Sequence, residues 1–156
     1  MKTRIAFFLA ASVLAGCATR DAEISSKARR EEKSDARVAS SASTYEDYKR
    51  DLAHHICHLN AAKVHSSRPQ ALLRSVVVVK YVVDAHGNLV KSEVLRSNHD
   101  RETESTALTA LRNSAPFPKP ASHLLRQGRI EISETWLFNN DGRFQLRTIA
   151  QPQMDS

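Results

Sequence analysis

The chain has 156 residues, a length that corresponds to one domain. Its formal net charge is +6, from 23 lysines and arginines against 17 aspartates and glutamates, and 6% of its residues are aromatic. Because the basic residues form no stripe and few aromatic residues accompany them, this composition argues against nucleic-acid binding.

Residues 1–16 are typical of a secretory signal peptide. Lys2 and Arg4 give a basic start, residues 5–14 are apolar apart from one serine, and small residues follow. The apolar stretch is about ten residues long, whereas a lasting transmembrane helix needs roughly 20 apolar residues. We therefore expect the segment to be removed, which would take away two basic residues and lower the net charge to +4.

The end of this segment, Leu14-Ala15-Gly16-Cys17, resembles the bacterial lipobox. In a lipobox the cysteine thiol receives a diacylglycerol, and two or more acyl chains anchor a protein stably to a membrane. The resemblance implies lipidation of Cys17 and a place on the periplasmic face of a bacterial membrane. Ala18, rather than an aspartate, follows the cysteine and favours the outer membrane, while the inner membrane stays open. The alternative is an ordinary signal peptide that happens to contain a cysteine.

Residues 17–44 are predicted to form a disordered polar tether. They consist mainly of alanine, serine and mixed charges, and Ile24 and Val38 are the larger apolar residues among them. Such a segment buries too little apolar surface to offset the entropy lost on ordering. The folded domain is therefore expected over residues 45–150.

The domain has the pattern of an α+β fold. Apolar residues recur at three- and four-residue spacing from Tyr45 to Ala62, which predicts a helix capped by Thr44. Residues 75–83 are β-branched and aromatic, and a turn at Gly87 leads to a second strand over residues 89–96.

A second helix is expected to end before Pro116, because proline disfavours a helical residue before it. Alternating apolar residues from Ile130 to Phe138 and from Phe144 to Thr148, joined by Asn139-Asn140-Asp141-Gly142, predict another hairpin. The order helix, strand, strand, helix, strand, strand favours a small antiparallel sheet with two helices on one face.

Several linked motifs resemble the C-terminal domain shared by the TonB and TolA energy-coupling proteins, over roughly residues 48–149. They are Val76 to Asp84, His86-Gly87-Asn88-Leu89-Val90, Val94 to Ser97 and Ala115-Pro116-Phe117-Pro118. His86 stands where the family has an aspartate, and Asn98-His99 where it has Ser-Gly. A lipobox and a short tether replace the family's membrane helix and long spacer, so the resemblance implies the fold and a binding role without energy transduction.

In that family a sheet edge accepts a strand from another protein, since unpaired N–H and C=O groups on an edge bind an incoming peptide. The resemblance makes the last strand the candidate edge: Phe144, Gln145, Leu146, Arg147, Thr148 and Ile149. The alternative is an edge covered by the tail or blocked by Arg143 and Arg147. The expected partner is a periplasmic or outer-membrane protein met in envelope assembly or receptor-linked transport.

One cluster of potential metal ligands occurs, at His54, Cys57 and His58. Their spacing on a helix suits zinc or copper, but three ligands on one helix seldom close a tetrahedral site, so metal handling is the alternative function. With Cys17 lipidated, Cys57 has no cysteine to pair with and is expected to be buried. No cofactor is predicted, and because nucleophile-elbow, zinc-protease and phosphate-loop motifs are absent, the sequence does not predict an enzyme.

Overall fold

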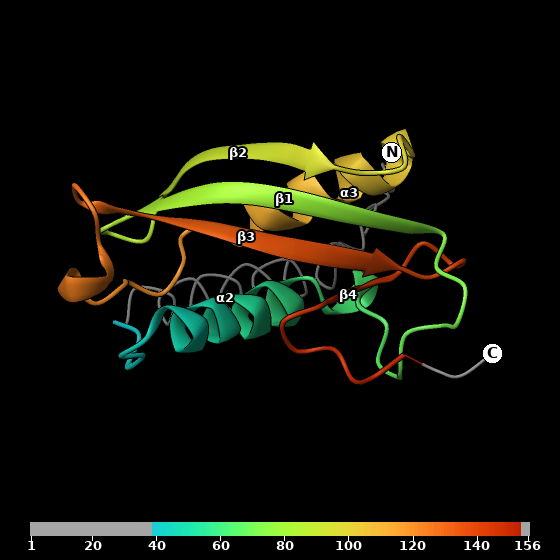
Figure 1. The fold of residues 1–156 in the computed structure, drawn as a ribbon, viewed down its shortest axis with the longest axis horizontal. Helices are drawn as coiled ribbons and strands as arrows, with labels where there is room; N and C mark the ends of the chain where they lie inside the picture. The colour runs from blue at the N-terminus through green and yellow to red at the C-terminus, as the bar shows by residue number, and fades with distance from the viewer. Residues whose placement is uncertain (1–38, 154–156) are drawn as a thin grey trace, which may run out of the picture. The chain divides into compact units, whose positions relative to one another are not determined.

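The computed structural model describes residues 39–153, an α+β domain with one four-stranded antiparallel sheet (Figure 1). Its longer helices are α2 (Tyr45–Leu59) and α3 (Arg101–Asn113), and two single-turn helices are η1 (Ala61–Lys63) and η2 (Ser122–Leu124). The strands are β1 (Ser75–Asp84), β2 (Leu89–Arg96), β3 (Arg129–Phe138) and β4 (Phe144–Leu146). The predicted signal peptide, Cys17 and the tether up to residue 38 lie outside the described residues.

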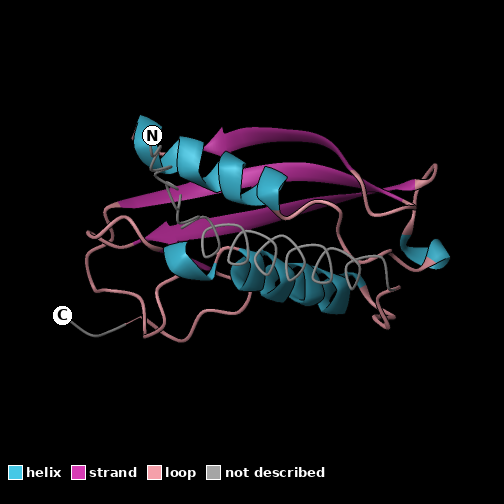
Figure 2. Cartoon of the chain, turned by 180° about the vertical axis from the view of Figure 1, so that it is seen from behind, coloured by secondary structure: helices cyan, strands magenta, loops and turns pink. Residues whose placement is uncertain are grey.

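The strands lie in the order β2-β1-β3-β4, so β1 and β3 are central and β2 and β4 are the two edges. β1 pairs with β2 through a tight turn in which Gly87 has φ +84°, and a Cβ there would lie 2.1 Å from the Phe117 carbonyl oxygen. The chain then crosses the sheet through α3 and returns in β3. Both longer helices lie on the same face of the sheet, which leaves the other face without a helix among the described residues (Figure 2).

Each longer helix begins at a side-chain cap. The Thr44 hydroxyl accepts a hydrogen bond from the Asp47 N–H, and the Asp100 carboxylate accepts from the N–H groups of Glu102 and Thr103. These bonds satisfy amides that have no partner inside a helix. The buried residues of α2 are Tyr48, Leu52, Ala53 and Ile56, which confirms the middle of the apolar stripe that the sequence predicts. The helix ends earlier than predicted, at Leu59, and Ala62 belongs to η1.

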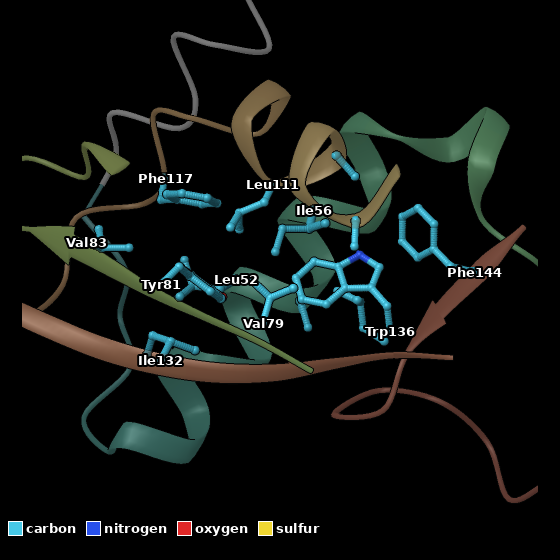
Figure 3. Packing of buried hydrophobic residues seen from close by; sticks show 14 of the residues in the cluster. Leu52, Ile56, Val79, Tyr81, Val83, Leu111, Phe117, Ile132, Trp136 and Phe144 are labelled. Carbon is cyan, nitrogen blue, oxygen red and sulfur yellow. The ribbon is translucent and has the colours of Figure 1, made fainter. Parts of the chain in front are cut away.

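The core lies between the helices and the covered face of the sheet. Alternate residues of β1 point into it, and Trp136 of β3 packs beside Phe144 with their ring centroids 6.5 Å apart (Figure 3). Phe117, from the proline-rich loop, stacks on Tyr81 at 5.9 Å. Burial of each such side chain contributes roughly 1.5–3 kcal/mol, so this layer holds the helices on the sheet.

The end of the expected tether lies against the domain. The Ser40 N–H donates to the Lys119 carbonyl at 2.9 Å, its hydroxyl donates to Asp51 at 2.5 Å, and Ala42 is buried. Ordered structure therefore begins before Tyr45, because contacts with distant residues supply what the local sequence lacks.

Strand β4 is shorter than the sequence predicts. It ends at Leu146, and residues 147–149 form a turn. The Leu146 carbonyl accepts hydrogen bonds from both Ile149 N–H (3.1 Å) and Ala150 N–H (2.9 Å), and these bonds turn the backbone away from the sheet. The predicted strand over residues 144–149 is thus wrong for its second half.

Candidate functional site

The outward side of β4, the edge expected to bind a partner, is occupied by the chain itself. The Phe144 carbonyl accepts from the His65 N–H at 2.9 Å, and the Gln145 side-chain amide donates to the carbonyls of His65 and Ser67. The Leu146 carbonyl is used in the turn described above. An incoming strand at residues 144–149 would have to displace these bonds.

A second stretch of sheet edge lies where β4 ends. β3 has ten residues, and β4 pairs with three of them: Trp136, Leu137 and Phe138. At the other end of β3, Arg129 exchanges two hydrogen bonds with Arg126, at 2.8 and 3.1 Å. Between these two limits β3 has a neighbouring strand on its β1 side alone.

Three residues of β3 point their backbone groups away from β1 in this gap. The Thr135 carbonyl accepts from the Arg147 N–H at 2.9 Å, and alternate residues of a strand point the same way, so Glu131 and Ser133 share its direction. The N–H and C=O of Glu131 have no hydrogen-bond partner on that side among residues 39–153. We call Glu131, Ser133 and Thr135 the open edge of β3.

Side chains occupy two positions of the open edge where a neighbouring strand would bind. The Tyr45 hydroxyl is hydrogen-bonded to the backbone of Ser133, and burial raises the pKa of this partly exposed phenol against the effect of that bond. The Thr135 N–H donates to Oε1 of Glu134 at 2.7 Å. Neither bond is between backbones, so a partner strand could replace both without breaking the sheet.

Glu134 lies behind the open edge on the covered face of the sheet. It is 2% exposed, and burial raises the pKa of its carboxyl, while Thr148 and Lys49 oppose that rise. A hollow of ≈ 260 Å³ borders it and is lined by Glu46, Lys49, Arg50, Thr135, Arg147 and Thr148. The gap beyond β4 therefore carries a buried acid as well as unpaired backbone groups.

The opposite edge, β2, is less regular. Val90 and Leu95 have no partner in β1, because the register shifts at both places. Within the described part of the chain, the β2 backbone is hydrogen-bonded to β1 alone. Bulges and charged side chains such as Lys91 and Glu93 are devices that discourage strand addition. β2 is thus the weaker candidate of the two open edges.

The structure does not assemble a metal site from the predicted ligands. His54 and His58 lie on the exposed side of α2. Cys57 is half-buried rather than fully buried as expected; the backbone of Leu146 contacts it, and burial raises the pKa of its thiol to about 11. No group of three His, Cys, Asp or Glu residues is placed to hold a metal ion among residues 39–153. Metal handling therefore draws no support from this geometry.

In the same described range, no helix is both long and apolar enough to cross a membrane. Comparison of the chain with protein-family models, with curated proteins and with solved structures found no match.

Proposed function

We propose that the chain is a membrane-anchored periplasmic lipoprotein whose TonB/TolA C-terminal-like domain binds a protein partner. It would serve as an accessory in envelope assembly or receptor-linked transport and would not transduce energy itself. The observation that carries this proposal is the open edge of β3. Because β4 is short, this edge has no strand neighbour on the side away from β1. The proposed partner is a periplasmic or outer-membrane protein.

The open edge suits a short extended segment. Glu131 offers an unpaired N–H and C=O, and Ser133 and Thr135 offer groups that side chains occupy at present. Arg126 limits the gap at one end and Arg147 at the other. Main-chain hydrogen bonds of this kind supply affinity, while neighbouring side chains supply specificity.

The TonB/TolA-like fold is the finer part of the proposal. It is supported by the motifs from Val76 to Ser97 and at Ala115-Pro116-Phe117-Pro118, together with an antiparallel sheet that has both helices on one face. The anchor is supported by Leu14-Ala15-Gly16-Cys17, and acyl chains on Cys17 would hold the domain at the outer membrane.

Strand addition is tested with Glu131→Pro. Proline removes the outward N–H, and it is tolerated on a strand edge whose N–H faces away from the sheet. Glu131→Ala is the matched control, because it removes the same side chain and keeps the amide. After crosslinking in intact envelopes, we expect the partner to co-purify with the parent chain and with Glu131→Ala, and to be lost from Glu131→Pro. Equal recovery with both variants would refute strand addition.

The anchor is tested separately by metabolic labelling with palmitate. We expect label on the parent chain, none on Cys17→Ser, and unchanged label on Cys57→Ser, which is the control for the second cysteine of the sequence. Label that persists in Cys17→Ser would refute the anchor and leave the binding domain unaffected.

A further inference from the structure

Two hollows lie side by side at one end of the helix-free face of the sheet. Their volumes are ≈ 590 and ≈ 500 Å³, and both are lined by Leu73, Val76, Thr135 and Arg147. Leu137 adds to the first hollow, and Val78 and Arg96 add to the second. We call the joined hollows the Val76 groove.

The floor of the groove is apolar and accessible. Val76, which lines both hollows, is 40% exposed although it lies within β1. Val78 and Leu137, which line one hollow each, are half-buried. Accessible apolar side chains in a surface hollow are typical of an interaction surface.

The charge of the groove has one sign. Three arginines line it and no acidic residue does. Arg74 is held by Asp100 at 2.8 Å and by Glu102 at 2.6 Å. Arg96 and Arg147 have no side-chain hydrogen bond or ion pair with any residue in the described range 39–153. Two guanidinium groups are thus available for carboxylates.

The other end of the same face carries both signs of charge. Lys80 lies 2.7 Å from Glu93 and 3.9 Å from Glu131, and Lys91 lies 2.9 Å from Glu93. Arg126 and Arg129 lie beside Glu131 in a hollow there. An acidic partner would meet acidic side chains at that end, whereas none lines the groove, so the groove suits such a partner better.

The groove also continues the open edge of β3. Thr135 belongs to both, and Arg147 follows β4 at the place where the open edge begins. An extended segment bound along β3 would therefore pass directly into the groove. A polypeptide fits this arrangement better than a lipid headgroup, because one chain can satisfy backbone amides and two arginines in succession.

We infer that the Val76 groove binds an acidic segment of the partner protein, in which apolar side chains alternate with aspartate or glutamate. The apolar side chains would lie on Val76 and Leu137, and the carboxylates would pair with Arg96 and Arg147. The inference rests on the proposed protein-binding role and adds the chemistry of the partner, but it does not need strand addition at Glu131.

The probe is a blocked peptide of alternating aspartate and leucine, titrated into the ¹⁵N-labelled whole chain. We expect amide shifts at Val76, Thr135 and Arg147. The double variant Arg96→Ala/Arg147→Ala should bind about tenfold more weakly, which corresponds to about 1.4 kcal/mol. The control Arg101→Ala/Arg112→Ala removes two exposed arginines from α3 and should bind like the parent.

Three results would overturn the inference. They are equal binding of an alternating lysine–leucine peptide, unchanged binding by Arg96→Ala/Arg147→Ala, and arginine-dependent binding to phosphatidylglycerol vesicles without binding of the peptide. The two proposals fail separately. Loss of the envelope partner in the double arginine variant with its retention in Glu131→Pro refutes strand addition alone, and the reverse pattern refutes the groove alone.

Discussion

The two faces of β1 show the same residue types in two environments. Val77, Val79, Tyr81 and Val83 are no more than 1% exposed and pack under the helices, whereas Val76, Val78, Lys80 and Val82 alternate with them on the helix-free face. The buried set holds the domain together, because it is covered on every side. On the helix-free face Val76 is 40% exposed and the other three residues are half-buried, so this set contributes less to folding and leaves Val76 accessible for binding.

The largest expected effect separates these faces directly. Val79→Ala should lower the free energy of unfolding by about 2–3 kcal/mol, since it leaves a cavity in the core. Val76→Ala removes the same atoms from an exposed position and should change it by less than about 0.5 kcal/mol. Urea unfolding of the two variants measures both values. Similar losses in the two variants would show that the helix-free face is covered by something that stabilises it.

Glu134 extends the comparison of the two faces to an acidic side chain on the helix-covered face. Because burial raises the pKa of its carboxyl, the folded chain holds this proton more tightly than the unfolded chain, and stability is lost as pH rises through the folded pKa. Glu134→Gln should therefore stabilise the protein at pH 7, because the amide carries no charge to bury. The gain should shrink as pH falls toward 4, because Glu134 of the parent then becomes neutral like the glutamine of the variant. A gain independent of pH would contradict this explanation.

The smallest effect concerns the ion pairs of Glu93 with Lys80 and Lys91 on the helix-free face. Hydrogen bonds from Lys80 and Lys91 lower the pKa of Glu93 to about 2. An NMR titration of the Glu93 carboxyl should give a midpoint near this value, and Lys80→Ala/Lys91→Ala should return it toward 4.5. The contribution of these ion pairs is present above the unfolded pKa and is lost as pH falls through the folded one. A midpoint that does not move would show that the lysines do not hold this carboxyl.

Local patterns in the sequence predict most of the sheet and both longer helices. The β-branched residues of β1, the cap at Thr44 and the turn at Gly87 are all short-range features.

The coverage of β4 could not be predicted in this way. His65 and Gln145 are 80 residues apart, and their contact has no local signal. The groove also joins residues that are distant in sequence, because Arg96 ends β2 and Arg147 follows β4, at opposite edges of the sheet. Such sites depend on strand order, which the pattern of apolar residues leaves open.

The most direct test of partner binding is photo-crosslinking in intact envelopes. Benzoylphenylalanine would replace Val76, Glu131 or, as a control on the helix-covered side, Arg112, which is exposed near the end of α3. We predict that one partner protein crosslinks to positions 76 and 131 and not to position 112. Crosslinks of that partner to position 112 alone, or none at positions 76 and 131, would contradict the proposed binding surface.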